Sequence, residues 1–397
     1  MRILMLSWEY PPRIIGGVSR HVYEICDALA AKDVQIDVIT CEHPEAPEKE
    51  EINGVNVYRV KAGESDGDFV KWVKHLNDLT EQKADELLAE HGKEPVLIHA
   101  HDWLAEYAAK SLKLKHKLPV VATIHATEYG RNYGIHTDLH RYINQVEWEL
   151  AFEAWRVICC SHFMKEEIIR ALGTSADKID VIPNGVDWKK FEIDFDRKSF
   201  RRTFAGDDEK IIFFVGRMVN EKGAGVLIEA MSKISAAELP AKLLIVGGGD
   251  RTDLRQQAED LGIADKVFFT GYIDDDTLLK IYNIADIAVF PSLYEPFGIV
   301  ALEAMAAKVP VVTSDVGGLR EVVDHGVTGI TTWAGNPDSL AWGITQSLTN
   351  PGAAKSMAGT AYMKVRNVFA WPRIAERTLE VYRRVADEHS RSTWGVD

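Results

Sequence analysis

Short apolar runs alternate with amphipathic stretches along the whole chain. In the first half the apolar runs are RILMLS, QIDVITC, NVYRV, VLIHAHD, VVATIHA, RVICCS and KIDVIPNGV, and GGVSRHVYEICDALAAKD has the spacing of a helix. In the second half they are KIIFFVGR, KLLIVGGG, KVFFTGYI, IAVFPSL, VPVVTSD and GITTW, with helices between them. This alternation predicts an α/β fold of two Rossmann-like halves, each a parallel sheet whose strands are buried on both faces.

The domain boundary is predicted near Pro183–Phe191, in the segment IPNGVDWKKF. A chain of 397 residues is longer than one hydrophobic core usually supports, so two domains are expected. We assign residues 1–188 to the first domain and residues 189–372 to the second. The tail FAWPRIAERTLEVYRRVADEHS predicts a long final helix that begins near Pro372.

Composition indicates a globular protein of a reducing compartment. Apolar residues make up 46% of the chain and charged residues 27%, and no apolar run approaches the roughly 20 residues of a membrane span. The opening MRILMLSWEYPP turns polar too soon for a signal peptide. The cysteines show neither metal-ligand spacing nor a disulfide framework, so we expect a cytoplasmic protein; they are Cys26, Cys41, Cys159 and Cys160.

The net charge of −14 argues against nucleic acid and anionic membranes as partners. One basic segment, KSLKLKHKL from Lys110 to Leu118, raises the alternative of a membrane-docking helix. It lacks the aromatic anchors of such helices, so we interpret it as a solvated helix face and expect no membrane partner.

Two glutamates, Glu295 and Glu303, stand in the run SLYEPFGIVALEAMAA. A helix is predicted to begin near Phe297 and Gly298, which places Glu295 in the loop before it and Glu303 in its first turns. Free N–H groups and the positive end of the helix dipole at this start are suited to an anion such as a pyrophosphate.

A second signal is the loop GRMVNEKG, which begins at Gly216 and supplies two positive charges, Arg217 and Lys222. Arg217 has a forked guanidinium and Lys222 a compact ammonium, and both suit phosphate oxygens. The two glutamates are then free to accept hydrogen bonds from hydroxyl groups of a sugar and a ribose.

These motifs carry a family resemblance. EPFGIVALE reproduces the E-x7-E motif of retaining GT-B glycosyltransferases, and GRMVNEKG resembles their G-R-x4-K-G phosphate loop. The chain resembles glycosyltransferase family 4 over nearly its whole length. The resemblance implies a GT-B fold with two Rossmann-like domains facing a central cleft, a final helix, 373–397, that joins the first domain, and a nucleotide-sugar substrate with no cofactor.

The resemblance also implies roles for individual residues. Arg217 and Lys222 neutralise the leaving diphosphate, Glu295 holds sugar hydroxyls, and His125 lies beside the reacting sugar carbon, where its backbone carbonyl stabilises developing positive charge. We count His125, Arg217, Lys222 and Glu295 as catalytic. The predicted donor-binding residues are Gly16, Gly17, Gly216, Gly248, Tyr272, Ile273, Phe297, Gly298, Ile299, Val300 and Glu303.

Acceptor-side residues are predicted near the N-terminus. SWEYPPRIIGG resembles the E-x-x-P…GG opening of α-glucan synthases, with Arg13 in place of their more usual lysine. Glu9, Arg13 and Asp102 are therefore expected to contact the acceptor. For Gly16 and Gly17 the alternative is an ordinary strand-to-helix turn.

Two places in the sequence are candidates for metal binding. His99 and His101 share one strand face, but no third ligand of suitable spacing is evident, so we predict no metal. Asp274, Asp275 and Asp276 include the D-x-D of the unrelated GT-A class; here they are expected only to start a helix.

The predicted function is retaining transfer of glucose from ADP- or UDP-glucose to an α-glucan or glucose 1-phosphate. WEYPPRIIGGVSRHV, IHAHDWLA and TIHATEYGRN resemble glycogen-synthase-like and maltose-1-phosphate-synthase-like members. The alternatives are a mannosyl- or glucosyltransferase acting on a lipid or cell-envelope glycan, a UDP-N-acetylglucosamine epimerase and a non-catalytic sugar-nucleotide sensor. The sequence leaves open the nucleobase, the sugar, the acceptor, a homo-oligomer and assistance by a divalent ion.

Overall fold

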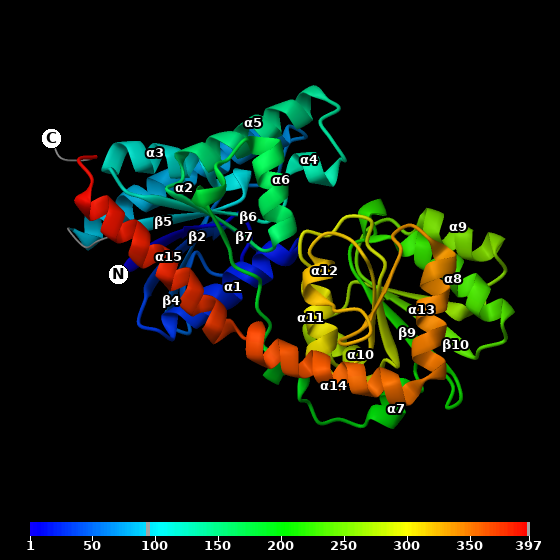
Figure 1. Cartoon of the computed structure of the whole chain (residues 1–397). Helices are drawn as coiled ribbons and strands as arrows, with labels where there is room; N and C mark the ends of the chain where they lie inside the picture. The colour runs from blue at the N-terminus through cyan, green and yellow to red at the C-terminus, as the bar shows by residue number, and fades with distance from the viewer. Residues whose placement is uncertain (93–95, 395–397) are drawn as a thin grey trace. The chain divides into compact units, whose positions relative to one another are not determined.

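The computed structural model describes residues 1–92 and 96–394, which divide into two compact units. The first unit comprises 1–185 together with the chain from Trp371 onward, and the second comprises 186–370. Each unit is an α/β sheet covered by helices (Figure 1). The division falls after Gly185, where the sequence assigned the boundary to residue 188.

The first unit contains an eight-stranded sheet of order β3-β4-β2-β1-β5-β6-β7-β8. Its strands are β1 (Arg2–Leu6), β2 (Gln35–Cys41), β3 (Lys49–Ile52), β4 (Val55–Val60), β5 (Val96–His101), β6 (Val120–Ile124), β7 (Arg156–Cys159) and β8 (Ile179–Val181). Its helices are α1 (Gly17–Ala30), α2 (Phe69–His91), α3 (Glu106–His116), α4 (Glu128–Arg131), α5 (Asp138–Glu153), α6 (His162–Leu172) and α15 (Trp371–Arg391). Short 3-10 turns are η1 (Trp103–Ala105) and η2 (Ala176–Lys178).

One strand of this sheet departs from the prediction of a parallel sheet. β3 pairs antiparallel with β4, Lys49 opposite Tyr58 and Ile52 opposite Val55. Its sequence, KEEI, is charged because it is an edge strand whose residues are half-buried or exposed, so it carries no apolar signal. The other pairings in the sheet are parallel, as the strand–helix alternation predicted.

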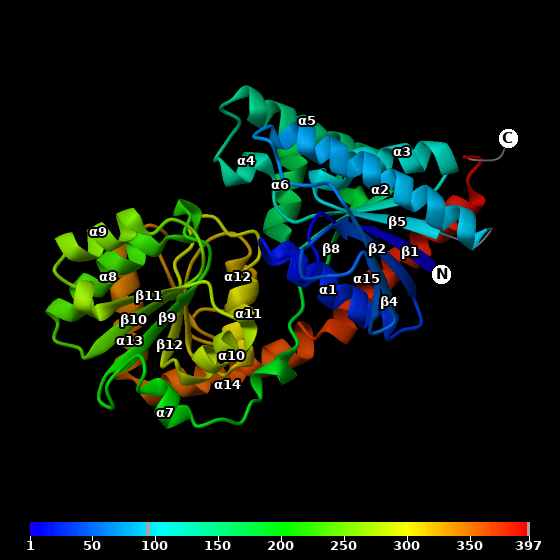
Figure 2. The same ribbon diagram turned by 180° about the vertical axis from the view of Figure 1, so that it is seen from behind.

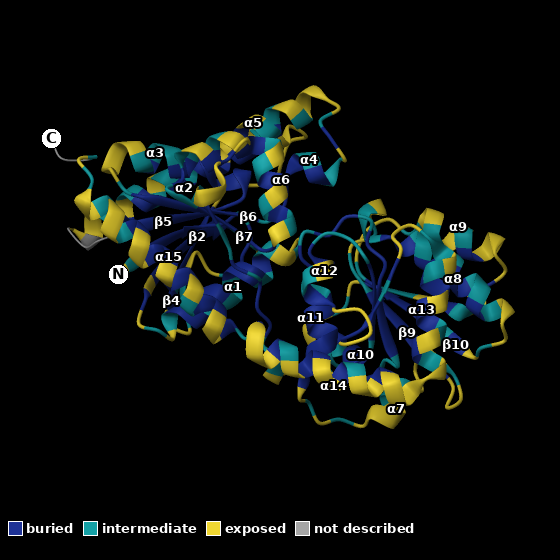
Figure 3. Ribbon diagram, in the orientation of Figure 1, coloured by how far each residue is buried: buried dark blue, intermediate teal, exposed yellow. Residues whose placement is uncertain are grey.

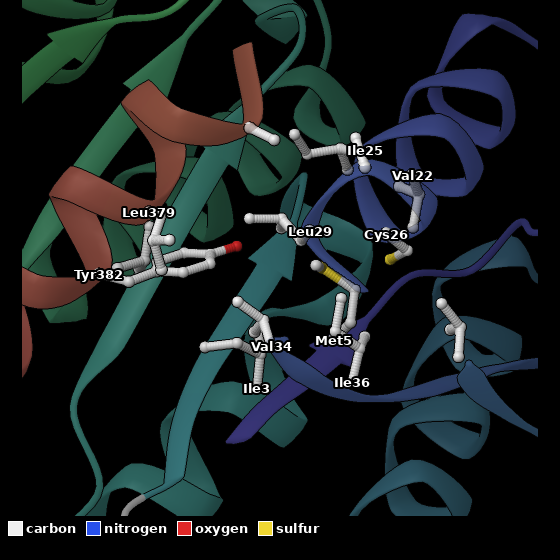
Figure 4. Packing of buried hydrophobic residues seen from close by; sticks show 14 of the residues in the cluster. Ile3, Met5, Val22, Ile25, Cys26, Leu29, Val34, Ile36, Leu379 and Tyr382 are labelled. Atoms are coloured by element: carbon white, nitrogen blue, oxygen red, sulfur yellow. The ribbon is translucent and has the colours of Figure 1, made fainter. Parts of the chain in front are cut away.

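The final helix belongs to the core of the first unit. α15 lies along α1 on one face of the sheet, and α2, α3 and α5 lie on the other face (Figures 1 and 2). Side chains of α1, α15 and the strands interdigitate, with Tyr382 and Leu379 facing Leu29 and Met5 (Figure 4). The buried positions on α15 recur every three to four residues, which is the periodicity of one helix face.

The second unit contains a six-stranded parallel sheet of order β11-β10-β9-β12-β13-β14. Its strands are β9 (Lys210–Val215), β10 (Ala241–Val246), β11 (Val267–Gly271), β12 (Ile287–Phe290), β13 (Val311–Ser314) and β14 (Ile330–Thr332). Its helices are α7 (Arg197–Arg201), α8 (Ala224–Ala236), α9 (Thr252–Asp260), α10 (Asp275–Ile284), α11 (Ile299–Ala306), α12 (Leu319–Val322), α13 (Pro337–Thr349) and α14 (Pro351–Val368). The 3-10 turns are η3 (Trp188–Phe191), η4 (Asn220–Lys222) and η5 (Ala264–Lys266). The central strands are buried on both faces, as their apolar sequences predicted (Figure 3).

Candidate active site

The carboxyl edge of the second sheet brings the two sequence motifs together. From β9 the sheet extends through β10 to β11 on one side, and the chain then adds β12, β13 and β14 on the other side of β9. The topological switch point therefore lies between β9 and β12. The phosphate loop, 216–223, follows β9, and the glutamate loop, 291–298, follows β12. The N–H of Leu293 donates to the carbonyl of Glu221 at 2.8 Å and ties the loops to each other. Ligands of open α/β sheets bind at such a switch point.

Lys222 and Glu295 form an ion pair between these loops. Lys222 Nζ lies 2.8 Å from Glu295 Oε2, and the side chains are 22% and 10% exposed. Ser292 Oγ donates to the same oxygen at 3.2 Å. A carboxylate this buried needs a compensating cation. The more exposed ammonium of Lys222 can in addition meet an incoming anion.

Gly223 explains why the phosphate loop can lie so close to its neighbour. It caps the start of α8 with φ +71°, and a Cβ atom at this position would come 2.0 Å from the carbonyl oxygen of Pro291. At the other end of the loop, the Gly216 N–H donates to the carbonyl of Val246 at 3.0 Å. Arg217 is 54% exposed and pairs with Glu221 at 3.0 Å. An exposed pair of this kind is worth little, so its guanidinium is available to a ligand.

The predicted anion-binding helix begins at Ile299, one residue after Gly298, which caps it. The N–H groups of Ile299 and Val300 lie in the first turn, where no intrahelical acceptor exists for them. Phe297 is 3% exposed and packs edge-on against Phe369, with ring centroids 6.1 Å apart. The Phe297 side chain therefore belongs to the core, and only the Phe297 backbone remains for a ligand.

Glu303 lies in α11 and is 6% exposed. The hydroxyl of Tyr282, on α10, donates to Glu303 Oε2 at 2.7 Å. This contact orients the carboxylate and was not predicted, because Tyr282 sits at an ordinary apolar position of its helix.

Three further donor-binding predictions fall at neighbouring strand ends. Tyr272 and Ile273 follow β11, and the Tyr272 side chain is 76% exposed. Gly248 follows β10 and accepts a hydrogen bond from the N–H of Met218 at 3.0 Å. Nothing lies within 4 Å of the place of a Cβ atom at Gly248, so the protein's own packing does not demand a glycine there.

In the first unit, Glu9 supports the glycine loop. Its Oε2 accepts the N–H groups of Ile15 at 2.8 Å and Gly16 at 3.0 Å, and the residue is only 2% exposed. Burial raises the pKa of Glu9, while the two backbone donors oppose this rise. Gly16 caps α1 and Gly17 begins it. The expected contact of Glu9 with an acceptor remains a prediction.

The Arg13 guanidinium lies over the rings of Trp8 and Trp72, 5.8 and 5.7 Å from their centroids. Stacking of this kind fixes the position of a cation without neutralising its charge. Arg13 Nε is buried and has no hydrogen-bond partner among the described residues.

His125 and Asp102 are joined through the backbone. The N–H of His125 donates to Asp102 Oδ1 at 2.8 Å, and Asp102 is 3% exposed with φ +58°. Burial raises the pKa of Asp102 to about 6, against the opposing effect of Arg131 and the backbone donors. Backbone strain of this kind is often found at active sites, which agrees with the role predicted for this region. Asp102 thus positions His125, a role that the sequence did not reveal.

Two more buried carboxylates hold the loop that follows His125. The N–H of Glu128 donates to Glu147 Oε1 at 2.8 Å, and Thr127 Oγ1 donates to Glu167 Oε1 at 2.6 Å. Burial raises the pKa of Glu147 to about 8. Sequence reasoning missed these residues because Glu147 and Glu167 look like ordinary polar positions on α5 and α6. The available signal was a glutamate at a helical position that the spacing marks as buried.

His99 and His101 have different surroundings in the structure, although the sequence places both on one strand face. The sequence shows no third metal ligand of suitable spacing beside this pair. In the structure His99 contacts Tyr382 and Thr123, and His101 instead converges with His21 and His125. His21 was missed although it stands on the buried face of α1.

The acidic and basic segments have structural partners. Asp274 caps α10 and accepts the N–H of Thr277 at 2.8 Å, so this D-x-D starts a helix. Lysines of α3 pair with acidic residues, Lys110 with Glu149 and Lys113 with Glu153. None of the described helices is both long and apolar enough to span a bilayer.

Comparison with known proteins places the chain among glycosyltransferases. The family model for Glycosyltransferase Family 4 matches residues 15–190, and the model for Glycosyl transferases group 1 matches residues 195–364. An uncharacterized glycosyltransferase of Methanocaldococcus jannaschii is 41% identical over 388 residues, 96% of this chain and 98% of the relative. A glycogen synthase of Mycobacterium tuberculosis is 35% identical over 399 residues, 96% of this chain and 94% of the relative.

Solved structures agree on the architecture. Sucrose-phosphate synthase of Thermosynechococcus elongatus has a TM-score of 0.84 at 26% identity, covering 98% of this chain and 99% of that one. HepE of Anabaena, solved with UDP and glucose, has a TM-score of 0.79 at 23% identity, covering 97% and 100%. The chain therefore belongs to the glycogen-synthase-like glycosyltransferases of family 4, which have the GT-B fold.

Proposed function

We propose that this glycosyltransferase is a retaining hexosyltransferase that moves glucose from ADP-glucose or UDP-glucose to an α-glucan or to glucose 1-phosphate. The observation that carries the proposal is the Lys222–Glu295 pair, 2.8 Å between Nζ and Oε2, at the switch point of the second sheet and beside the first turn of α11. This pair combines a cation for a diphosphate with a carboxylate for sugar hydroxyls.

Groups of the second unit that are already in place stabilise the negative charge of the donor's diphosphate. As the bond between the sugar C1 and the diphosphate oxygen breaks, negative charge grows on that oxygen. Lys222, Arg217 and the N–H groups at the start of α11 stabilise this charge. The preorganised loops need no rearrangement to do so, because Gly223 and the Leu293–Glu221 hydrogen bond already fix them.

The sugar and ribose are held by the two glutamates. Glu295 accepts hydrogen bonds from sugar hydroxyls and shares Lys222 with the diphosphate. Glu303, oriented by Tyr282, accepts from the ribose hydroxyls. The His125 carbonyl stabilises positive charge at C1. The acceptor hydroxyl attacks C1 on the face that the diphosphate leaves, and its proton passes to the departing phosphate oxygen, so the α configuration is retained.

The relatives support glucose and a glucan or sugar-phosphate acceptor. Besides the glycogen synthase, an alpha-maltose-1-phosphate synthase of Mycolicibacterium smegmatis is 28% identical over 415 residues. A structure of HepE contains UDP-glucose. A D-inositol 3-phosphate glycosyltransferase of Rhodococcus erythropolis, 28% identical, keeps open another phosphorylated acceptor or an envelope glycan.

A turnover screen tests the proposal. ADP-glucose, UDP-glucose and GDP-mannose are offered against glycogen, maltodextrin, glucose 1-phosphate and a lipid acceptor, and proton NMR of the first product gives its anomer. An α-glucosyl product from glucose 1-phosphate or a glucan is expected. A β-linked product would overturn retention, and transfer from GDP-mannose alone would overturn the choice of donor.

A further inference from the structure

Three histidines from separate elements of the first unit converge at the carboxyl edge of its sheet. His21 comes from the first turns of α1, His101 ends β5, and His125 follows β6. Each can offer one ring nitrogen so that all three nitrogens lie within 4.8 Å of one another. The His125 ring centroid lies 4.7 Å from that of His21 and 5.3 Å from that of His101.

The hydrogen bonds define which nitrogens carry lone pairs. Asn184 Oδ1 can only accept, so His21 Nδ1, 2.7 Å away, carries the proton and Nε2 keeps the lone pair. The Met5 sulfur also only accepts, so His101 Nε2, 2.9 Å away, is protonated and Nδ1 keeps the lone pair. That lone pair faces His125 Nε2 at 3.0 Å.

Burial of the cluster favours the neutral form of these imidazoles. Burial lowers the pKa of His21 and His101 well below the usual value, and burial, reinforced by Arg131, lowers the pKa of His125 to about 3. Neutral imidazole is the form that ligates metals. The hydrogen bonds of His21 to Asn184 and of His101 to Met5 fix ring orientation from behind, as outer partners do in metal sites.

We propose that His21 Nε2, His101 Nδ1 and His125 Nε2 bind one Zn²⁺ ion, with the fourth tetrahedral position open. Zinc bonds to imidazole are about 2.0–2.1 Å long, which places tetrahedral nitrogens roughly 3.4 Å apart. Nitrogens that lie within 4.8 Å of one another would therefore have to approach by up to about 1.4 Å. The proton now between His101 and His125 moves to His125 Nδ1, so binding releases no proton.

The ligand set selects the class of ion. Three imidazoles with no carboxylate oxygen among them suit zinc and related transition metals and do not suit Mg²⁺ or Ca²⁺. No thiolate belongs to the set. If His125 serves the reacting sugar as proposed above, the ion occupies a catalytic residue, and zinc is a reversible inhibitor of transfer.

The fourth histidine of the cluster provides a matched control. The His99 ring lies 4.3 Å from that of His101, but both its nitrogens are engaged, Nδ1 with Tyr382 Oη at 2.6 Å and Nε2 with Thr123 Oγ1 at 2.7 Å. It is therefore a buried histidine of the same cluster that contributes no ligand. His136, which is exposed, and His140, which is half-buried, lie outside the cluster and control for adventitious binding.

The test is titration of the purified full-length chain, stripped with a chelator, with Zn²⁺ by calorimetry and with Co²⁺ by visible absorption. One ion per chain with a tetrahedral cobalt spectrum is expected. His21→Gln and His125→Gln should each weaken zinc binding by more than about a hundredfold, since even outer partners contribute 10–100-fold. His99→Gln and His136→Gln/His140→Gln should bind as the wild type does.

Absence of stoichiometric binding, or binding unchanged in His125→Gln, would overturn the site. His125 is only partly buried, so this variant remains informative if His21→Gln fails to fold, which thermal unfolding reports. Inhibition is measured separately. Zinc binding without inhibition would leave the site standing and show that the His125 ring can be occupied without loss of transfer.

Discussion

Replacing Glu295 by Gln separates the sugar-binding role of this carboxylate from the phosphate-binding role of Lys222. The substitution keeps the size of the side chain and one acceptor oxygen, but it removes the charge that faces Lys222 Nζ at 2.8 Å. The ammonium of Lys222 then no longer faces a carboxylate in this pair. A bound diphosphate also no longer faces a negative carboxylate across the loop.

The two effects have opposite signs and different sizes. Loss of a charged contact to the sugar in the transition state costs on the order of 2.7 kcal/mol, which is about a hundredfold in kcat/KM. The net worth of a part-buried ion pair is about 1 kcal/mol, so nucleoside diphosphate affinity is expected to stay the same or rise by up to roughly fivefold. The assay pairs steady-state kinetics with calorimetric titration of the nucleoside diphosphate.

Lys222→Ala is the opposite perturbation, because it leaves the buried Glu295 without its cation and removes the proposed phosphate contact. It should weaken both diphosphate binding and turnover. The control is Lys233→Ala, which removes an exposed ion pair of similar length, 2.9 Å to Asp338, from the same unit. If Glu295→Gln lowers diphosphate affinity in step with kcat/KM, the assigned division of roles is wrong.

Three other perturbations test separate parts of the molecule. The buried carboxyl of Glu147, whose pKa is raised to about 8, stabilises the fold fully below about pH 4.5, and this contribution falls as pH rises to about 8. In Glu147→Gln, the free energy of unfolding by urea should therefore change less with pH across that window than in the wild type. A pH profile that runs parallel to that of the wild type would refute the assignment. Gly298→Ala should destabilise the fold by more than about 1 kcal/mol and weaken diphosphate binding, because φ is +108° and the new Cβ would lie 2.5 Å from Leu319 Cδ2. Tyr272→Ala, at a 76%-exposed ring, should leave the melting temperature unchanged and weaken diphosphate affinity about tenfold if the ring stacks on the base; unchanged affinity removes Tyr272 from the site.

The strands and helices were predictable where one physical signal dominated. Continuous apolar runs gave the buried parallel strands, and the spacing of FAWPRIAERTLEVYRRVADEHS gave a helix that begins at Trp371, one residue before the predicted Pro372. β3 was not predictable, because KEEI is stabilised by pairing with β4 at an exposed edge and not by burial. Local sequence reports burial well and reports pairing poorly.

The candidate residues of the first unit were harder to predict from sequence than those of the second unit, for a related reason. In the second unit the functional groups come from contiguous loops, so Glu295 and Glu303 stand eight residues apart in sequence and both lie at one helix start. In the first unit the loop after His125 is fixed by carboxylates from three elements: Asp102 before η1, Glu147 on α5 and Glu167 on α6.

No spacing rule connects those three carboxylates, since their positions depend on how α5 and α6 pack on the sheet. Each is almost fully buried, and each accepts a hydrogen bond from a backbone or hydroxyl donor of the His125 loop. A buried carboxylate with such a bond is costly to leave unpaired. The loop and its carboxylates must therefore fold together, and removal of any one hydrogen bond should displace His125 before it unfolds the domain. The His125 loop of the first unit is thus built by tertiary packing, whereas the arrangement of Glu295 and Glu303 in the second unit is encoded in local sequence.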